Sequence, residues 1–285
     1  MCAIEARSEA HIVCLGERRY RVDRDWLRWP TPGDRGFVSH VAVNSRDELH
    51  VLNRGNPVIQ IFSPSGRFLG DWHTNLVTHG HGIHIDARDR IFIVDSDRHC
   101  VHVFSPTGQH QLSLGRRDRP VYGRPFNHPT DVTVTRNGHI YVSDGYGNSH
   151  VHRFAADGRH VATWGGAGAA PGAFANPHAI ATAWDDTLLV VDRENGRVQR
   201  FTGEGVYVDE IRDLYLPTAV TVGEDGWIYV SDQCPRLSAY ARDGRLIGRC
   251  RTFGAVGHGI TIDSTGDVYI ADMMPSGVSR FRRMS

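Results

Sequence analysis

Short runs of apolar residues alternate with polar turns along most of the 285-residue chain. One unit begins at Asn176-Pro177-His178-Ala179-Ile180, turns at Asp185-Asp186, and continues with an apolar run, Leu188 to Val191, that ends in Asp192-Arg193. Runs of this length between turn residues predict β-strands. Five further copies begin at Ser39-His40-Val41, His81-Gly82-Ile83, Thr130-Asp131-Val132, Thr218-Ala219-Val220 and His258-Gly259-Ile260. Their spacing of about 40 to 50 residues indicates a repeat architecture.

Each copy predicts four strands in succession. A polar turn such as Asp86-Ala87-Arg88-Asp89 joins the first two strands, a third follows as in Val101 to Phe104, and a Gly-containing turn leads to a fourth as in Phe68 to Trp72. Four antiparallel strands form one propeller blade, so six copies predict an all-β, six-bladed β-propeller around a central channel. An open β-solenoid or a sandwich of short strands is the alternative for this pattern.

The last copy supplies only three strands before the chain ends at Ser285. An incomplete blade would leave an exposed edge, which proteins avoid. The alternating segment Arg19 to Trp26 is expected to complete the last blade and close the ring. We therefore expect an N-terminal tail over residues 1–17, with a short strand allowed at His11 to Leu15, and a single propeller domain over residues 18–285.

Composition narrows the range of partners and compartments. The formal net charge is zero and the pI is about 7.3, which favours neither a nucleic acid nor a membrane surface as partner. No apolar run is long enough for a membrane span, and the segment Met1 to Arg7 lacks the apolar core of a secretory signal. The five cysteines are scattered, odd in number and without CxxC spacing, so free thiols in a reducing cytoplasm are expected.

One position at the start of the first strand of each copy is the main candidate for chemistry. In copies one to six it is occupied by Ser39, His81, Thr130, His178, Thr218 and His258. Alternate blades of a six-bladed ring lie about 120° apart, so three imidazoles would converge on the channel axis. Three neutral histidines and one open position form a catalytic zinc site. The chain has 17 histidines, most of them expected at the surface; of those near the site, His40, His79 and His84 are candidate second-shell partners.

A second position follows the end of the second strand and should lie at the same mouth of the channel. It is occupied by Arg54, Ser96, Gly145, Arg193, Gln233 and Met273. Arg54 and Arg193, on opposite blades, would suit a carboxylate or other anionic substrate. Alternatively, each forms a salt bridge, for example with Asp192 or Glu194. Tyr146, directly after Gly145, is a candidate general base, or else an aromatic lid over the loop.

The repeats resemble NHL repeats, and the set His81, Tyr146, His178, Arg193 and His258 resembles the catalytic domain of peptidyl-α-hydroxyglycine α-amidating lyase. The matching phrases are Pro129 to Val132, Val142 to Ser149 and Val191 to Arg197. The resemblance implies that the three histidines hold zinc, that Tyr146 removes the substrate hydroxyl proton, and that Arg54 and Arg193 contact the substrate.

The sequence departs from that family at two kinds of position. Gly147 stands where a disulfide cysteine follows the tyrosine, and Leu189 and Arg200 replace another cysteine pair. Gly259 stands where an Asp contributes to a structural calcium site, so calcium is doubtful here. Without disulfides or a signal peptide, a secreted prohormone is not the expected substrate.

The functional prediction is a zinc-dependent lyase that cleaves a carbinolamide C–N bond of a small carboxylated substrate into an amide and an aldehyde such as glyoxylate. A zinc-dependent hydrolase, hydratase or other lyase on a small anionic metabolite would use the same residues. A non-enzymatic NHL propeller that binds a protein or RNA is the second class of function, because propellers host many activities. The substrate, the metal and the oligomeric state stay open.

Overall fold

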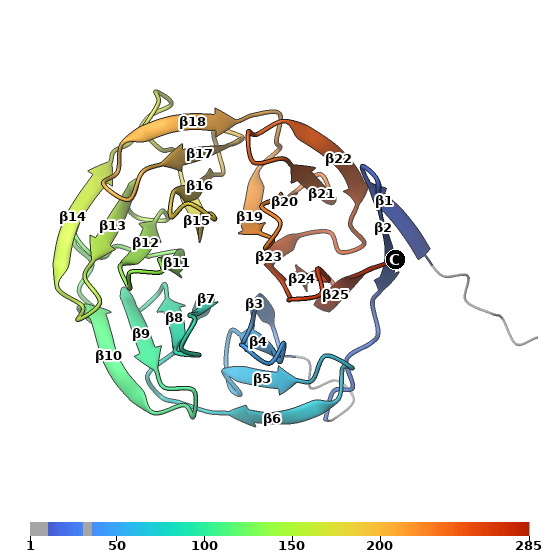
Figure 1. The fold of residues 1–285 in the computed structure, drawn as a ribbon. Coiled ribbons are helices and arrows are strands. Elements are labelled where there is room, and N and C mark those ends of the chain that lie inside the picture. The colour runs from blue at the N-terminus through green and yellow to red at the C-terminus, as the bar shows by residue number, and fades with distance from the viewer. Residues whose placement is uncertain (1–10, 31–35, 285) are drawn as a thin grey trace, which may run out of the picture.

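The computed structural model describes residues 11–30 and 36–284, which form 25 β-strands and no helix. The strands are divided among six sheets, and these are arranged as blades around a central channel (Figure 1). The prediction of an all-β, six-bladed propeller is therefore confirmed.

Blades 1 to 5 each contain four antiparallel strands that follow one another from the channel to the rim. Blade 1 contains β3 (Val38–Val43), β4 (Leu49–Asn53), β5 (Ile59–Phe62) and β6 (Phe68–Trp72). Blade 2 contains β7 (Gly80–Ile85), β8 (Ile91–Asp95), β9 (Cys100–Phe104) and β10 (His110–Gly115). Blade 3 contains β11 (Asp131–Val134), β12 (Ile140–Asp144), β13 (His150–Phe154) and β14 (His160–Gly165). Blade 4 contains β15 (Pro177–Thr182), β16 (Leu188–Asp192), β17 (Arg197–Phe201) and β18 (Tyr207–Ile211). Blade 5 contains β19 (Pro217–Val222), β20 (Ile228–Asp232), β21 (Arg236–Tyr240) and β22 (Leu246–Arg251).

Blade 6 joins the two ends of the chain. Its strands β23 (Gly257–Ile262), β24 (Val268–Met273) and β25 (Ser276–Arg283) are extended by β2 (Arg18–Asp23) and β1 (His11–Leu15). In the antiparallel pair of β2 and β25, Val22 lies opposite Phe281 (Figure 1). The predicted closure of the ring by an N-terminal strand is thus confirmed. The division into a tail over 1–17 and a domain over 18–285 stays a prediction, although β1, which begins at His11, pairs with β2.

The hydrophobic core is divided among the interfaces between neighbouring blades. Six clusters of buried side chains are described, and each draws its members from two adjacent blades. Phe92 and Val94 of blade 2, for example, pack with Val132 and Ile140 of blade 3. Each such side chain contributes about 1.5–3 kcal/mol when it is fully buried. This packing fixes the angle between blades and therefore the position of every inner strand around the channel.

The aspartate that ends the second strand in most repeats has a structural role. Its carboxylate accepts a backbone hydrogen bond from the loop that precedes the inner strand of the same blade. In these bonds the backbone N–H of Thr78 donates to Asp95 (2.6 Å), that of Asn127 to Asp144 (2.9 Å), that of Ala175 to Asp192 (2.8 Å) and that of Tyr215 to Asp232 (3.3 Å). These bonds hold the loops at the channel mouth, where the candidate site lies.

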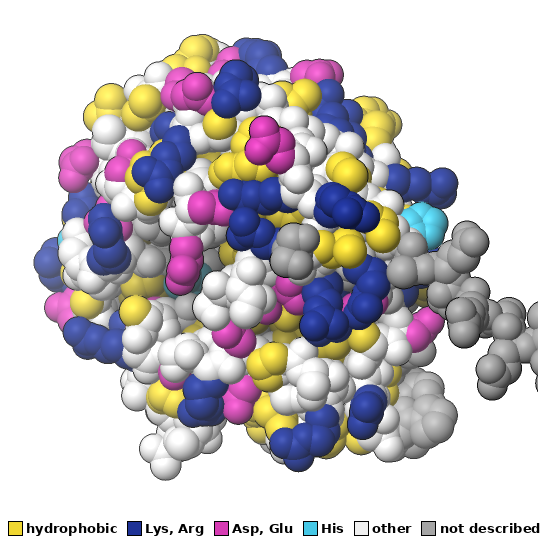
Figure 2. Space-filling model, turned by 45° about the vertical axis from the view of Figure 1, so that its right-hand side comes forward, with side chains coloured by type: hydrophobic (Ala, Val, Ile, Leu, Met, Phe, Trp, Pro, Cys, Tyr) yellow, Lys and Arg dark blue, Asp and Glu magenta, His cyan; other side chains and the backbone are white. Residues whose placement is uncertain are grey.

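The surface carries both signs of charge. On the face seen in Figure 2, basic and acidic side chains are interspersed with hydrophobic ones. Within the described residues, no helix has the length and apolar character that crossing a membrane would require. Four cysteines, Cys14, Cys100, Cys234 and Cys250, are free thiols, whereas Cys2 lies outside the described residues.

Candidate metal centre at the channel mouth

His81, His178 and His258 meet at one end of the channel. They lie on the inner strands of blades 2, 4 and 6, their side chains are buried, and their ligand atoms are within 4.8 Å of one another. Each strand pairing shifts its register at the histidine, so that the residue before it and the residue after it are paired but the histidine is not. A β-bulge of this kind redirects a side chain. The three bulges therefore explain how the imidazoles leave the sheets and enter the channel.

Each imidazole is oriented by a backbone carbonyl of the next blade. The Nδ1 atoms lie 2.6 Å from the Thr130 oxygen for His81, 2.7 Å from the Thr218 oxygen for His178, and 2.8 Å from the Ser39 oxygen for His258. A carbonyl only accepts hydrogen bonds, so Nδ1 carries the hydrogen and Nε2 keeps a free lone pair. Burial lowers the pKa of all three imidazoles, to about 3 for His178 and well below the ordinary value for the other two. They are neutral at physiological pH, as metal ligands must be.

The Nε2 atoms face donors from two other side chains. The Tyr146 hydroxyl lies 2.8 Å from Nε2 of His81 and 3.0 Å from Nε2 of His178, and Arg54 Nη2 lies 3.4 Å from Nε2 of His258. Three neutral nitrogen lone pairs are thus directed at one region, and among the described residues the Tyr146 hydroxyl and the Arg54 guanidinium point into it. This donor set fits a divalent ion that prefers imidazole ligands. The cluster could therefore hold a metal ion.

Tyr146 reaches the centre because blade 3 approaches blade 4 closely at its mouth. A Cβ atom at Gly145 would lie 2.4 Å from the carbonyl oxygen of Pro177, so only glycine allows this approach. The phenol ring is 42% exposed, yet its hydroxyl lies between two imidazoles. Burial raises the pKa of Tyr146, and the positive charges of Arg193 and Arg54 act in the opposite direction.

The two arginines extend from the rim of the mouth. The backbone N–H of Arg54 donates to Phe37 (2.9 Å), and that of Arg193 donates to Asn176 (2.9 Å), which ties both positions to the loops before the inner strands. The Arg54 side chain has no ion pair with any described residue, its Nε lacks a partner, and burial lowers its pKa. Among the described residues, Arg54 is therefore a half-buried cation at the mouth without an ion-pair partner.

Arg193 already has an anionic neighbour. Its Nε donates to Oε1 of Glu194 (2.8 Å), and its guanidinium lies 5.7 Å from the centre of the Tyr146 ring. The salt-bridge alternative thus holds for Arg193 with Glu194, whereas Asp192 pairs with Arg197 (2.8 Å). A partly exposed pair such as Arg193–Glu194 contributes little to stability, so a substrate carboxylate could replace Glu194.

None of the three nearby histidines considered as possible second-shell partners is hydrogen-bonded to a ligand imidazole within the described structure. His79 faces Asp97 at 3.5 Å, Nδ1 of His40 contacts the backbone of Val41, and His84 lines the channel further from the mouth. Sequence reasoning missed the real partners, the backbone carbonyls of Ser39, Thr130 and Thr218. Their signal was present, because these residues occupy the histidine position in the intervening repeats.

His40 and Asp131 form a floor below the three histidines. Oδ2 of Asp131 accepts the Ile180 N–H (3.1 Å) and Oδ1 has no partner. A Cβ atom at Gly259 would lie 2.6 Å from Cγ of His40. The Asp that the family resemblance would require at position 259 for calcium therefore collides with His40. Beyond this floor the channel continues as a cavity of about 310 Å³.

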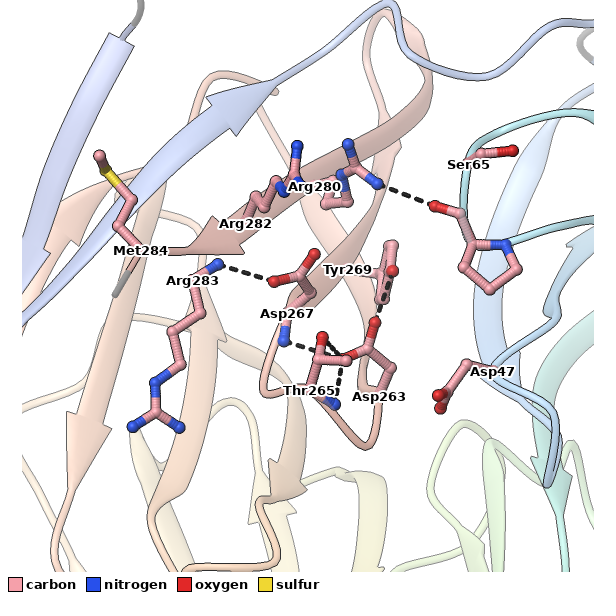
Figure 3. Close-up of a pocket in the computed structure, with 11 residues that line it drawn as sticks. Asp47, Ser65, Asp263, Thr265, Asp267, Tyr269, Arg280, Arg282, Arg283 and Met284 are labelled. Carbon is pink, nitrogen blue, oxygen red and sulfur yellow. Dashed lines mark hydrogen bonds between the residues drawn. The ribbon is translucent and has the colours of Figure 1, made fainter.

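A larger cavity lies at the seam between blades 6 and 1, by the turns that end the inner strands. It measures about 730 Å³ and is shown in Figure 3. We call it the seam pocket; it is lined by Asp47, Pro64, Ser65, Asp263, Thr265, Asp267, Tyr269, Arg280, Arg282, Arg283 and Met284. Asp263 accepts hydrogen bonds from Thr265, from the Asp267 N–H and from the Tyr269 hydroxyl. The hydrogen bonds of this carboxylate therefore stabilise its own turn and hold the Tyr269 hydroxyl.

The fold and the repeats define the class of protein. A model of the NHL repeat matches residues 126–154 and 174–201, which cover much of blade 3 and the first three strands of blade 4. The chain is a six-bladed propeller with NHL repeats, as the sequence predicted.

Comparison with named proteins specifies the resemblance. The chain is 28% identical over 300 residues to a probable peptidyl-alpha-hydroxyglycine alpha-amidating lyase of Caenorhabditis elegans, covering 98% of this chain and 81% of the relative. It is 30% identical over 312 residues to peptidylglycine alpha-amidating monooxygenase of Rattus norvegicus, covering 90% of this chain but only 31% of that protein's length. A streptogramin B lyase structure superposes with a TM-score of 0.68 over 95% of this chain and 100% of that one, and its 15% identity shows a shared fold alone. The predicted resemblance to amidating lyases is confirmed.

Proposed function

We propose that the protein is a zinc-dependent lyase that cleaves the carbinolamide C–N bond of an N-acyl-α-hydroxyglycine or a similar small carboxylated substrate. The products would be an amide and an aldehyde such as glyoxylate. The lyase and monooxygenase names of its relatives support this class of enzyme. The observation that carries the proposal is the Tyr146 hydroxyl, 2.8 Å and 3.0 Å from Nε2 of His81 and His178.

The three imidazoles would hold the metal through Nε2. When bound there, zinc would supply a Lewis acid that polarises the oxygen of the substrate hydroxyl group. The chain's own contribution is a dry, preorganised set of neutral ligands, since each Nδ1 is already bonded to a carbonyl. Another divalent ion that accepts imidazole is compatible with this set.

Tyr146 is the proposed base. Its oxygen removes the proton of the substrate hydroxyl, the O–H electron pair becomes the second bond of the aldehyde C=O, and the C–N bond breaks with its pair moving to nitrogen. The phenol then returns the proton to that nitrogen, so the amide leaves with its N–H group complete and no oxidant or water is consumed. Burial raises the pKa of Tyr146, and the positive charges of Arg193 and Arg54 oppose this effect by favouring the charged phenolate that the step requires.

The same arginines would orient the substrate. The half-buried Arg54 side chain has no ion-pair partner among the described residues, and a carboxylate is the natural counter-ion for a planar guanidinium. Arg193 stands beside the Tyr146 ring and would exchange Glu194 for the substrate. We propose no nucleic-acid or membrane partner, and a cytoplasmic location in keeping with the free thiols.

The direct test is incubation of zinc-loaded protein with N-benzoyl-α-hydroxyglycine, with benzamide and glyoxylate measured separately. We expect the two products in equal amounts and at a rate proportional to enzyme. A metal-loaded, folded protein that leaves this substrate intact would contradict the lyase proposal. The alternatives would then be a hydrolase, a hydratase or another lyase that uses the same residues, or a propeller that binds a partner without catalysis.

A further inference from the structure

Three hydroxyl groups from the intervening blades hold the backbone next to the ligand histidines. Each belongs to a residue of the odd-numbered blades and donates to the carbonyl of the residue that immediately precedes a histidine. The bonds are Ser39 to Gly80 (2.7 Å), Thr130 to Pro177 (2.7 Å) and Thr218 to Gly257 (2.5 Å). All three hydroxyl residues are buried. The donors are thus placed with the same threefold symmetry as the histidines.

Together with the Nδ1 contacts, these bonds form a closed circuit that visits every blade. His81 donates to the Thr130 carbonyl and the Thr130 hydroxyl to Pro177, next to His178. His178 donates to the Thr218 carbonyl, and the Thr218 hydroxyl to Gly257, next to His258. His258 donates to the Ser39 carbonyl, and the Ser39 hydroxyl to Gly80, next to His81. We call these six bonds the mouth circuit.

The mouth circuit joins elements that the sheets leave separate. Each blade is its own hydrogen-bonded sheet, and ladder bonds therefore do not connect one inner strand to the next. A hydroxyl bonded to the peptide group before a histidine fixes the backbone that carries the imidazole, and the Nδ1 bond fixes the rotation of the ring. Loss of one of these bonds leaves a buried carbonyl with one donor fewer, which is unfavourable, so the circuit resists opening at any point.

A second layer of hydroxyls supports the circuit in blades 3 and 5. Ser143 lies 2.9 Å from the Thr130 hydroxyl, and Ser231 donates to the Gly257 carbonyl (3.0 Å). Both serines precede the repeat aspartate, in the phrase Val-Ser-Asp. In the blades that carry the histidines, the same position is apolar, with Val94, Val191 and Ala271. Thr at one position and Ser at the other therefore go together in blades 3 and 5, whereas Ser39 of blade 1 and the three histidines go with an apolar residue, Leu52 in the case of Ser39.

We infer that Ser39, Thr130 and Thr218 are positioning residues that set the geometry of the three-histidine centre without touching the ion. This inference rests on the proposed metal site but not on the lyase reaction. Each hydroxyl residue serves two ligands at once, one through its carbonyl and one through its hydroxyl. Thr218 couples His178 to His258 in this way and makes no such bond to His81.

Thr218→Val tests the inference because it removes the hydroxyl and keeps nearly the same shape. We expect Thr218→Val to bind Zn²⁺ about 10-fold more weakly in competition with a chelator, and Thr218→Ser to stay within about twofold of the parent protein, as for partners beyond the ligands themselves. Thr221→Val, three residues further along β19 and outside the mouth circuit, is the matched control and should bind zinc normally. Unfolding transitions of all three variants separate lost affinity from lost stability.

A second measurement uses metal-free protein and is independent of activity. Nitrogen NMR of the imidazoles should show the Nδ1–H tautomer for all three histidines. Thr218→Val should shift the signals of His258, whose preceding carbonyl loses the Thr218 hydroxyl, but not those of His81. Unchanged zinc affinity and unchanged imidazole signals in folded Thr218→Val would overturn the inference, as would equal losses in Thr218→Ser and Thr218→Val. If Thr218→Val does not fold, Ser39→Ala with Ser39→Thr gives the same test, with His81 as the affected histidine and His178 as the unaffected one. A protein without lyase activity that still gives these shifts would refute the proposed function alone.

Discussion

The channel mouth and the seam pocket are both polar, but they differ in how far the fold satisfies the hydrogen-bonding capacity of their polar groups. In the seam pocket, Asp263 receives four hydrogen bonds from its own turn and from Tyr269 (Figure 3). At the mouth, each ligand imidazole is bonded to the backbone through Nδ1 only, and Nε2 faces the side-chain ends of Tyr146 or Arg54. The seam pocket is the larger cavity, about 730 Å³. Binding capacity is therefore better identified by donors and acceptors that the fold leaves available than by volume.

The difference also separates stability from chemistry. Side chains that saturate one another hold a turn or a seam together, and their removal should weaken folding. Side chains whose reactive atoms the fold leaves available contribute little to folding, and their removal should affect binding or turnover. Variants from the two regions can break or sharpen this distinction.

Tyr146→Phe should produce the largest effect on chemistry. It removes one oxygen, so fold and metal content should be retained, while turnover of N-benzoyl-α-hydroxyglycine should fall by roughly 10²- to 10⁴-fold, the range for a general acid–base group. The Michaelis constant should change less, because proton transfer acts mainly in the transition state. Near-normal turnover with metal still bound would leave the proposed reaction without its base.

Asp131 provides a pH-dependent contrast with Asp263. Burial raises the pKa of Asp131 to about 7, and the N–H groups of Ile180 and Val132 offset this only in part. The folded state therefore binds more protons than the unfolded state between about pH 4 and pH 7, and this group's contribution to stability falls as pH rises through that window. Asp131→Asn should gain about 1–4 kcal/mol of unfolding free energy over the parent protein between these limits. Denaturant unfolding of metal-free protein at both pH values measures the gain; an identical difference at both would contradict it.

Asp263→Ala should affect folding and spare the metal. It leaves the N–H groups of Thr265 and Asp267 and the Tyr269 hydroxyl without their acceptor, which should lower the free energy of unfolding by about 1–3 kcal/mol. Zinc content should equal that of the parent protein, because the seam pocket contributes no ligand to the histidine cluster. Loss of metal in a folded Asp263→Ala would show that the two regions are not separable.

Arg193→Lys should give the smallest effect. The chain contains no lysine, so every basic side chain other than histidine is an arginine. The presence of arginine at position 193 therefore reflects the composition of the chain as well as the geometry of the site. A single ammonium cannot reproduce a bidentate contact, so we expect the Michaelis constant for the carboxylated substrate to rise about 10-fold. The amidated analogue of the substrate is the control; an equal change for both would argue against a carboxylate contact.

Sequence periodicity predicted the fold because each blade is encoded by one copy of the same sequence pattern. In every copy the start of the first strand and the end of the second strand lie at the channel mouth. The periodicity also placed His81, His178 and His258 together, since alternate repeats carry them. The β-bulges that release these side chains leave no mark in the apolar pattern, and register could be read only from the structure. The repeat register did single out the positions of Thr130 and Thr218, but their contacts could be found only in the structure, because carbonyl and hydroxyl contacts between blades depend on how closely the inner strands approach.

The prediction for Arg193 shows a second limit of sequence reasoning. Asp192 and Glu194 both adjoin Arg193 in the chain. Strand alternation does not predict which of these two carboxylates faces the Arg193 guanidinium, because the strand ends here. In the structure Asp192 is buried with Arg197, and Glu194 pairs with Arg193. Only the three-dimensional arrangement showed that the available guanidinium at this mouth is that of Arg54.

Metal content tests the central claim most directly. Elemental analysis of the purified protein should find about one divalent ion per chain, with zinc expected, and His178→Ala should lose it because a three-histidine site depends on every ligand. His160→Ala, a histidine on the outer strand β14 with its Nε2 bonded to Thr163 (2.9 Å), is the matched control and should keep the ion. A parent protein that stays metal-free after exposure to zinc, or a His178→Ala variant with unaltered zinc affinity, would contradict the account.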